Sequence, residues 1–191
     1  MKNKEISYEI IDFSGETNVQ FRTSVDPGSY IPTHWHRAIE IIYMQEGSLD
    51  VTVESESFTI HEGDCILVNG NVLHSTKCTA PNTAILLQIP LDFMAKYIPD
   101  LGQLIFLWDY RTEDPVKKTK LMMLKTTLEQ LQVINDIHPD GYLLRFNSLI
   151  FELLFQLYHN FSVKVFHQNI NQRQKEMDRL DPVLNYIAEH Y

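Results

Sequence analysis

The segment from Gly28 to Gly47 constrains the fold most, because it sets three ligand-type side chains in an apolar stretch, GSYIPTHWHRAIEIIYMQEG. His34, His36 and Glu40 are separated by two and four residues. Alternate side chains of a β-strand share one face, so we predict a strand with these three on one face and isoleucines on the other. Burying two imidazoles and a carboxylate is costly unless they are paired, which favours a metal ion, a bound ligand or ordered water beside them.

A second stretch, GDCILVNGNVLH, begins at Gly63 and ends at His74. It reads as a short apolar strand followed by an Asn-Gly-Asn turn. Asn and Gly tolerate positive φ, so a tight reversal is expected there. We therefore predict that His74 lies across the sheet from the first three side chains.

The spacing within both stretches resembles the two signatures of the cupin superfamily. The first signature is matched without a gap at Gly28, His34, His36, Glu40 and Gly47. The second is matched in part, at Gly63 and His74. Asn69 stands where cupins usually carry Pro, and Asn71 where they carry Gly. Both departures fall on the loop that orients His74.

The resemblance implies a ligand set. In metal-dependent cupins three histidines and one glutamate hold the ion, and the matching residues here are His34, His36, Glu40 and His74. Zn, Fe, Mn and Ni all accept imidazole and are the candidate ions. Sensors of this class also use equivalent polar residues to hydrogen-bond a sugar without an ion, so both alternatives stay open.

Composition limits the class of protein. The chain has 191 residues, of which 44% are apolar and 21% charged, as expected for a soluble globular protein. No apolar run approaches the roughly 20 residues of a membrane helix, and the start lacks a signal-peptide core, so we expect a cytoplasmic protein without membrane contact. Cys65 and Cys78 are expected to be reduced thiols without a role. The formal net charge of −9 argues against direct nucleic-acid binding by this chain.

The hydrophobic period changes near residue 91. Short alternating segments up to residue 90 predict β-strands, whereas leucines three and four residues apart follow a helix start at Asp114 and Pro115. The HPDG sequence at 138–141 ends this helix, and a second apolar helix follows. The expected fold is mainly β with α: a cupin double-stranded β-helix barrel with an N-terminal arm in 1–90, then an antiparallel helical hairpin in 91–165. The apolar surface of the hairpin predicts either a homodimer seam or intrachain core.

Residues 166–191 read as a polar linker and the start of a further helix, VLNYIAEHY, that lacks a closing signal. Together with the cupin stretches, this phrase resembles the amino-terminal part of AraC/XylS-type transcriptional regulators. In that family such a phrase opens a helix-turn-helix DNA-binding domain. The resemblance implies a truncated regulator whose DNA contacts belong to a C-terminal domain absent from this chain.

The first functional hypothesis is an effector sensor without catalytic residues. A small molecule, such as a sugar, would bind in the barrel and alter the helices or the arm, residues 1–15. The expected ligand-binding residues are His34, His36, Glu40, His74, Arg22 and Tyr30. Further aromatic residues offer stacking surfaces or core packing, and these are Trp35, Tyr43 and Trp108. For Trp35 we expect packing.

Two other hypotheses use the same residues. A small metal-dependent cupin enzyme, an oxygenase or isomerase, would leave coordination positions open for substrate. A metal or pH sensor would differ from the first hypothesis only in its effector, since histidines titrate near neutrality.

Overall fold

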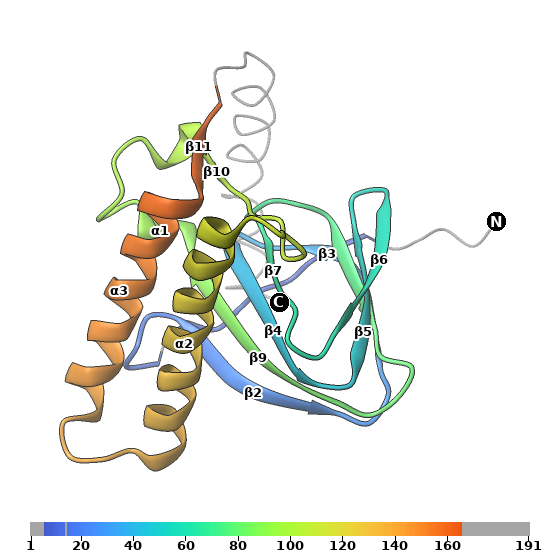
Figure 1. The fold of residues 1–191 in the computed structure, drawn as a ribbon, viewed down its shortest axis with the longest axis horizontal. Coiled ribbons are helices and arrows are strands. Elements are labelled where there is room, and N and C mark those ends of the chain that lie inside the picture. The colour runs from blue at the N-terminus through green and yellow to red at the C-terminus, as the bar shows by residue number, and fades with distance from the viewer. Residues whose placement is uncertain (1–5, 14, 166–191) are drawn as a thin grey trace, which may run out of the picture.

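Two β-sheets build the barrel, and a helical hairpin packs against one of them (Figure 1). The computed structural model describes residues 6–13 and 15–165. The five-stranded sheet has the order β1 (Ser7–Tyr8), β3 (Tyr30–Trp35), β8 (His74–Lys77), β5 (Ser48–Val53) and β6 (Glu56–His61). The four-stranded sheet has the order β2 (Gln20–Asp26), β9 (Asn82–Pro90), β4 (Ala38–Glu46) and β7 (Cys65–Val68). All strand pairs are antiparallel except β1 and β3. The predicted mainly β cupin barrel with added helices is thereby confirmed.

The predicted single strand from 28 to 47 is wrong in one respect. The chain bends at His36 and Arg37, so β3 lies in the five-stranded sheet and β4 in the four-stranded sheet. The segment crosses from one sheet to the other. Both strands nevertheless carry site residues into the barrel, because the two sheets enclose a common interior.

The second half of the described chain contains the helical hairpin and a short β-ribbon. Its elements are α1 (Leu91–Met94), a 3-10 helix η1 (Leu101–Gln103), β10 (Leu104–Phe106), α2 (Pro115–Ile137), α3 (Tyr142–Phe161) and β11 (Ser162–Lys164). The predicted start of α2 is confirmed: Asp114 is the N-cap and its carboxylate accepts hydrogen bonds from two backbone N–H groups of the first turn. The β10–β11 ribbon was not predicted, because strands of three residues are too short to show a period.

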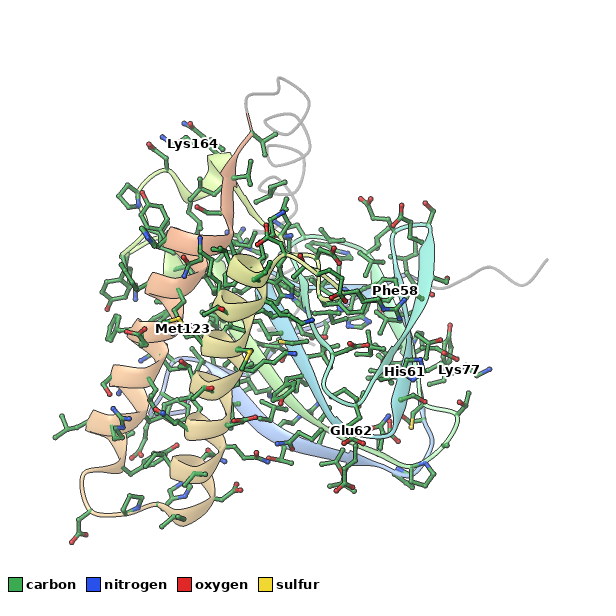
Figure 2. All side chains as sticks on the ribbon, in the orientation of Figure 1. Phe58, His61, Glu62, Lys77, Met123 and Lys164 are labelled. Atoms are coloured by element: carbon green, nitrogen blue, oxygen red, sulfur yellow. The ribbon has the colours of Figure 1, made fainter. Side chains whose placement is uncertain are left out.

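The hairpin covers one face of the barrel. Ile39 and Ile41 of β4 share a fully buried core with Leu124 and Leu128 of α2, and Leu153 of α3 belongs to the same cluster. The leucine stripe of α2 is therefore intrachain core, although the predicted homodimer stays a prediction. Figure 2 shows Met123 on the hairpin and Phe58, His61 and Lys77 on the opposite side of the barrel, which the helices leave uncovered.

Gly47 shows why the first signature ends in glycine. Its φ is +79°, and a Cβ at this position would lie 2.8 Å from the carbonyl oxygen of Pro81. Only glycine fits both the backbone conformation and the space.

Within the described residues no helix is both long and apolar enough to span a bilayer. The predicted linker and helix start at 166–191 lie outside the described residues.

Candidate functional site

Three histidines meet inside the barrel. His34 comes from the end of β3, His36 from the bend before β4, and His74 from the start of β8. The strand register places His34 opposite His74. One nitrogen of each ring lies within 4.8 Å of the others, and all three side chains are buried. The structure thus brings the predicted histidines into one cluster.

The hydrogen bonds of the outer ring nitrogens define the tautomers. Each Nδ1 atom donates to a backbone carbonyl, which can only accept. The acceptors are Pro32 for His34 (2.8 Å), Ala38 for His36 (3.0 Å) and Val72 for His74 (2.9 Å). In the neutral rings the hydrogen is therefore on Nδ1, and the three Nε2 lone pairs point at one another. Metal-binding histidines use the same arrangement, with the outer nitrogen held by a carbonyl or carboxylate.

Glu40 lies beside the cluster on β4. Its Oε2 atom is 3.2 Å from Nε2 of His36, and its Oε1 atom is 3.9 Å from Nε2 of His74. Gln88 of β9, the register partner of Glu40, donates a 2.6 Å hydrogen bond to Oε2. Burial alone would raise the pKa of Glu40, but a hydrogen bond from His36 when its Nε2 atom carries a proton, the positive charge of protonated His74 and His36, and a hydrogen bond from Gln88 lower it overall. Glu40 is therefore an ionised carboxylate.

His74 carries an orphaned acceptor. Burial lowers the pKa of His74, and the neighbouring Glu40 offsets this only in part. Its Nε2 atom is buried without a hydrogen-bond partner. When the three rings are neutral, their inward lone pairs and the ionised carboxylate repel one another, and either a proton between His36 and Glu40 or a metal cation removes this repulsion. The donor set of His34, His36, His74 and Glu40 consequently fits a divalent Zn, Fe, Mn or Ni ion.

A cavity of about 70 Å³ adjoins this cluster. About 10–15 Å³ of such space holds one water, so the cavity admits an ion with several waters or a small ligand. Its polar lining residues are Glu9, Arg22, Ser24, Asp26, His34, Glu40, Thr76, Asn82 and Gln88. The predicted Arg22 thus faces the cavity from β2. Tyr30 does not line it: this residue is 58% exposed and borders a separate surface hollow with Asp50 and Lys77.

The other aromatic candidates pack elsewhere, since none of them lines the cavity. Trp35 contacts the ring of Tyr8, with 4.6 Å between ring centroids. Tyr43 donates a 2.9 Å hydrogen bond to Glu129 of α2. The Trp108 Nε1 atom donates to a backbone carbonyl of β7 at 2.7 Å.

The loop that orients His74 explains the two departures from the cupin pattern. Asn69 pairs with the backbone of Phe106 in β10: Nδ2 donates to the carbonyl at 2.7 Å, and Oδ1 accepts from the N–H at 2.9 Å. Proline could form neither bond. Asn71 has φ of +63°, which Asn tolerates, and its N–H donates to the carbonyl of His36. The loop therefore joins the histidine cluster to β10.

Several polar residues of the cavity wall were not predicted from the sequence, and two of them, Glu9 and Gln88, lie against the histidine cluster and Glu40. Gln88 interrupts the apolar run of β9, and its position opposite Glu40 depends on a register that sequence does not give. Glu9 precedes both cupin stretches, yet its Oε2 atom lies 3.5 Å from Nε2 of His34. No local pattern pointed to it, because the pairing of β1 with β3 is non-local.

One family model agrees with this fold. The family model described as "Cupin domain" matches residues 21–90. The uncharacterized HTH-type transcriptional regulator YdeC of Bacillus subtilis (strain 168) is 22% identical over 218 aligned residues, which cover 100% of this chain and 69% of that protein.

Among solved structures, an RmlC-like cupin from Shewanella frigidimarina NCIMB 400 has 26% identity and a TM-score of 0.36, covering 39% of this chain and 70% of its own. Oxalate decarboxylase of Bacillus subtilis, described with Mn(II) centres, has 26% identity and a TM-score of 0.34. The match covers 38% of this chain and 21% of the oxalate decarboxylase chain. Residues 21–90 match the cupin-domain model, and the two-sheet barrel has the cupin fold.

Proposed function

We propose that this chain is the effector-sensing part of a DNA-binding transcriptional regulator and that its cupin cavity binds a small molecule. The observation that carries the proposal is the buried histidine cluster, whose Nε2 lone pairs converge beside a cavity of about 70 Å³. The similarity to YdeC over the whole chain supports the regulatory role. The net charge of −9 leaves DNA contact to a C-terminal helix-turn-helix domain.

The effector would bind at the polar wall of the cavity. A divalent ion held by His34, His36, His74 and Glu40 would supply a Lewis-acidic docking point for an effector oxygen. Arg22 would hold a hydroxyl or an anionic group from the β2 side. The cavity size favours a molecule no larger than a small sugar or sugar acid.

One route for transmitting occupancy runs through the loop at 69–73. The N–H of Asn71 in this loop donates a hydrogen bond to the carbonyl of His36, and the side chain of Asn69 bonds to the backbone of Phe106 in β10. β10 pairs with β11, the last described strand. A ligand that shifts the cluster would therefore act on the strand that precedes residue 166. Such a ligand must bind with different affinity to the protein with this loop–β10 contact formed and to the protein with the contact broken.

A second route runs through β4. Glu40 faces the cavity, whereas Tyr43 and Gln45 on the same strand bond to Glu129 and Gln132 of α2. Movement of β4 would therefore reach the hairpin directly.

A metal-dependent oxygenase or isomerase is the alternative function, because the same three imidazoles and carboxylate could serve a reaction as well as a sensor. The two functions differ in turnover. The enzyme would convert its ligand, whereas the sensor would bind and release it unchanged.

One double substitution separates these functions. His36→Leu with Glu40→Met removes two cluster groups, and Tyr30→Phe is the control because Tyr30 lies outside the cavity. Circular dichroism checks the fold, thermal shift with a panel of sugars and sugar acids measures binding, and a reporter with the full-length protein measures transcription.

The sensor function predicts that an effector at 100 times its Kd stabilises the wild type by about 2.7 kcal/mol. The folded double variant should lose this shift and the effector-dependent transcription, and the control should keep both. Oxygen-dependent or isomerising turnover of the effector by the wild type, lost in the double variant, would support the enzyme instead.

A further inference from the structure

Within the described part of the N-terminal arm, strand β1 fixes the chain to the barrel just before Glu9. Ser7 and Tyr8 pair in parallel with His34 and Trp35 of β3. The Tyr8 ring packs on Trp35, and the N–H of Glu9 donates a 2.9 Å hydrogen bond to the Trp35 carbonyl. This short pairing holds the backbone of Glu9 beside the strand that carries His34.

The carboxylate of Glu9 points into the histidine cluster. The side chain as a whole is 42% exposed, but its Oε2 atom is buried and has no hydrogen-bond partner. That atom lies 3.5 Å from Nε2 of His34 and 3.9 Å from Nε2 of His36. Both nitrogens present lone pairs in the neutral rings, because their Nδ1 atoms donate to carbonyls. With neutral rings, three acceptors therefore face one another, which is unfavourable without a metal cation or a proton on one of the nitrogens.

These separations suit ligands of one metal ion. Zn–N and Zn–O bonds of about 2.0–2.2 Å place neighbouring ligand atoms about 3.0–3.5 Å apart in tetrahedral or octahedral geometry. The Oε2 atom of Glu9 is at or slightly beyond this spacing from His34 and His36. Glu40 approaches His36 from the barrel side at 3.2 Å. The two carboxylates thus flank the same imidazole from different elements.

We propose that Glu9 is a ligand of the ion at the histidine cluster and that the ion thereby ties the N-terminal arm to the barrel. This inference rests on the proposed metal site and adds a ligand from outside the two cupin stretches. The ion then controls whether the arm is docked, because a pairing of two residues contributes few hydrogen bonds of its own. An effector oxygen that takes the position of Glu9 on the ion releases the arm.

The test compares Glu9→Gln with Glu16→Gln. The amide of Gln has nearly the same size as the carboxylate but is a much weaker ligand, and Glu16 is an exposed carboxylate of the same N-terminal segment. Co²⁺ and Zn²⁺ affinity is measured by competition with a chromophoric chelator. Hydrogen exchange at the amide of residue 9 reports arm docking directly, since this N–H is bonded to Trp35.

We expect Glu9→Gln to weaken metal binding by at least about tenfold, the lower end of the effect of losing even an outer partner of a metal site. Glu16→Gln should bind as the wild type does. Metal should slow exchange at residue 9 in the wild type and in Glu16→Gln, but not in Glu9→Gln.

Wild-type metal affinity in Glu9→Gln would overturn the proposal and leave the sensing function intact. Slow hydrogen exchange at the amide of residue 9 that depends on Glu9 but not on metal would also overturn the proposal, since Glu9 would then pair with protonated histidines. A wild type that takes up no metal would refute the metal site here and in the proposed function, whereas effector binding by that metal-free protein would still support sensing.

Discussion

Replacing Asn69 with Ala tests the contact between the site loop and β10. The Asn69 side chain makes two hydrogen bonds to the backbone of Phe106, at 2.7 and 2.9 Å, and Phe106 is 2% exposed. Alanine leaves one buried N–H and one buried C=O without a partner, at about 1–3 kcal/mol each. Because Asn69 itself is only partly buried, water relieves some of this cost. We expect the free energy of unfolding to fall by roughly 2–4 kcal/mol.

Urea denaturation followed by circular dichroism measures this loss. Asn147→Ala is the matched control, because the Asn147 side chain is partly buried like that of Asn69 but bonds to a carbonyl of its own helix. Its effect should stay within about 0.5 kcal/mol. If Asn69→Ala lost no more than the control, the two bonds would not hold β10 to the loop, and the first transmission route would be refuted.

Two further substitutions and one chemical labelling reaction test the fold. Gly47→Ala should cost at least about 2 kcal/mol in urea unfolding, because it strains the backbone at φ +79° and brings Cβ to 2.8 Å from the Pro81 carbonyl. A loss below about 1 kcal/mol would contradict that clash. Leu128→Ala should cost about 2–5 kcal/mol, since Leu128 is fully buried between α2 and the barrel, and a loss typical of surface sites would contradict that packing. Burial raises the pKa of Cys65 to about 12, so iodoacetamide at pH 8 should label it only after unfolding, and labelling of the native protein, mapped by mass spectrometry, would be inconsistent with this environment.

The helical hairpin could be predicted because its signals are local. Asp114 and Pro115 mark the start of α2 within two adjacent residues, and the apolar positions recur within single turns. His138 and Gly141 both adopt left-handed conformations at the break between α2 and α3. Each signal acts over a few residues, so no knowledge of the tertiary fold was needed.

The spacing of His34, His36 and Glu40 predicts the cluster for a reason that holds only in part. Equal parity grouped His34, His36 and Glu40 on one strand, whereas the chain bends between the sheets after His36. The grouping survives because the inner faces of both sheets border the same cavity. Glu9 and Gln88 escaped prediction because each reaches the site through strand pairing with a distant segment.

The metal content of the purified protein tests the central claim most directly. Elemental analysis after incubation with Zn²⁺ and desalting should find about one ion per wild-type chain. His74→Ala should retain the fold and lose the ion, because it removes the Nε2 atom that is buried without a partner. A wild-type chain that binds no metal, or a folded His74→Ala variant that keeps it with undiminished affinity, would contradict the account.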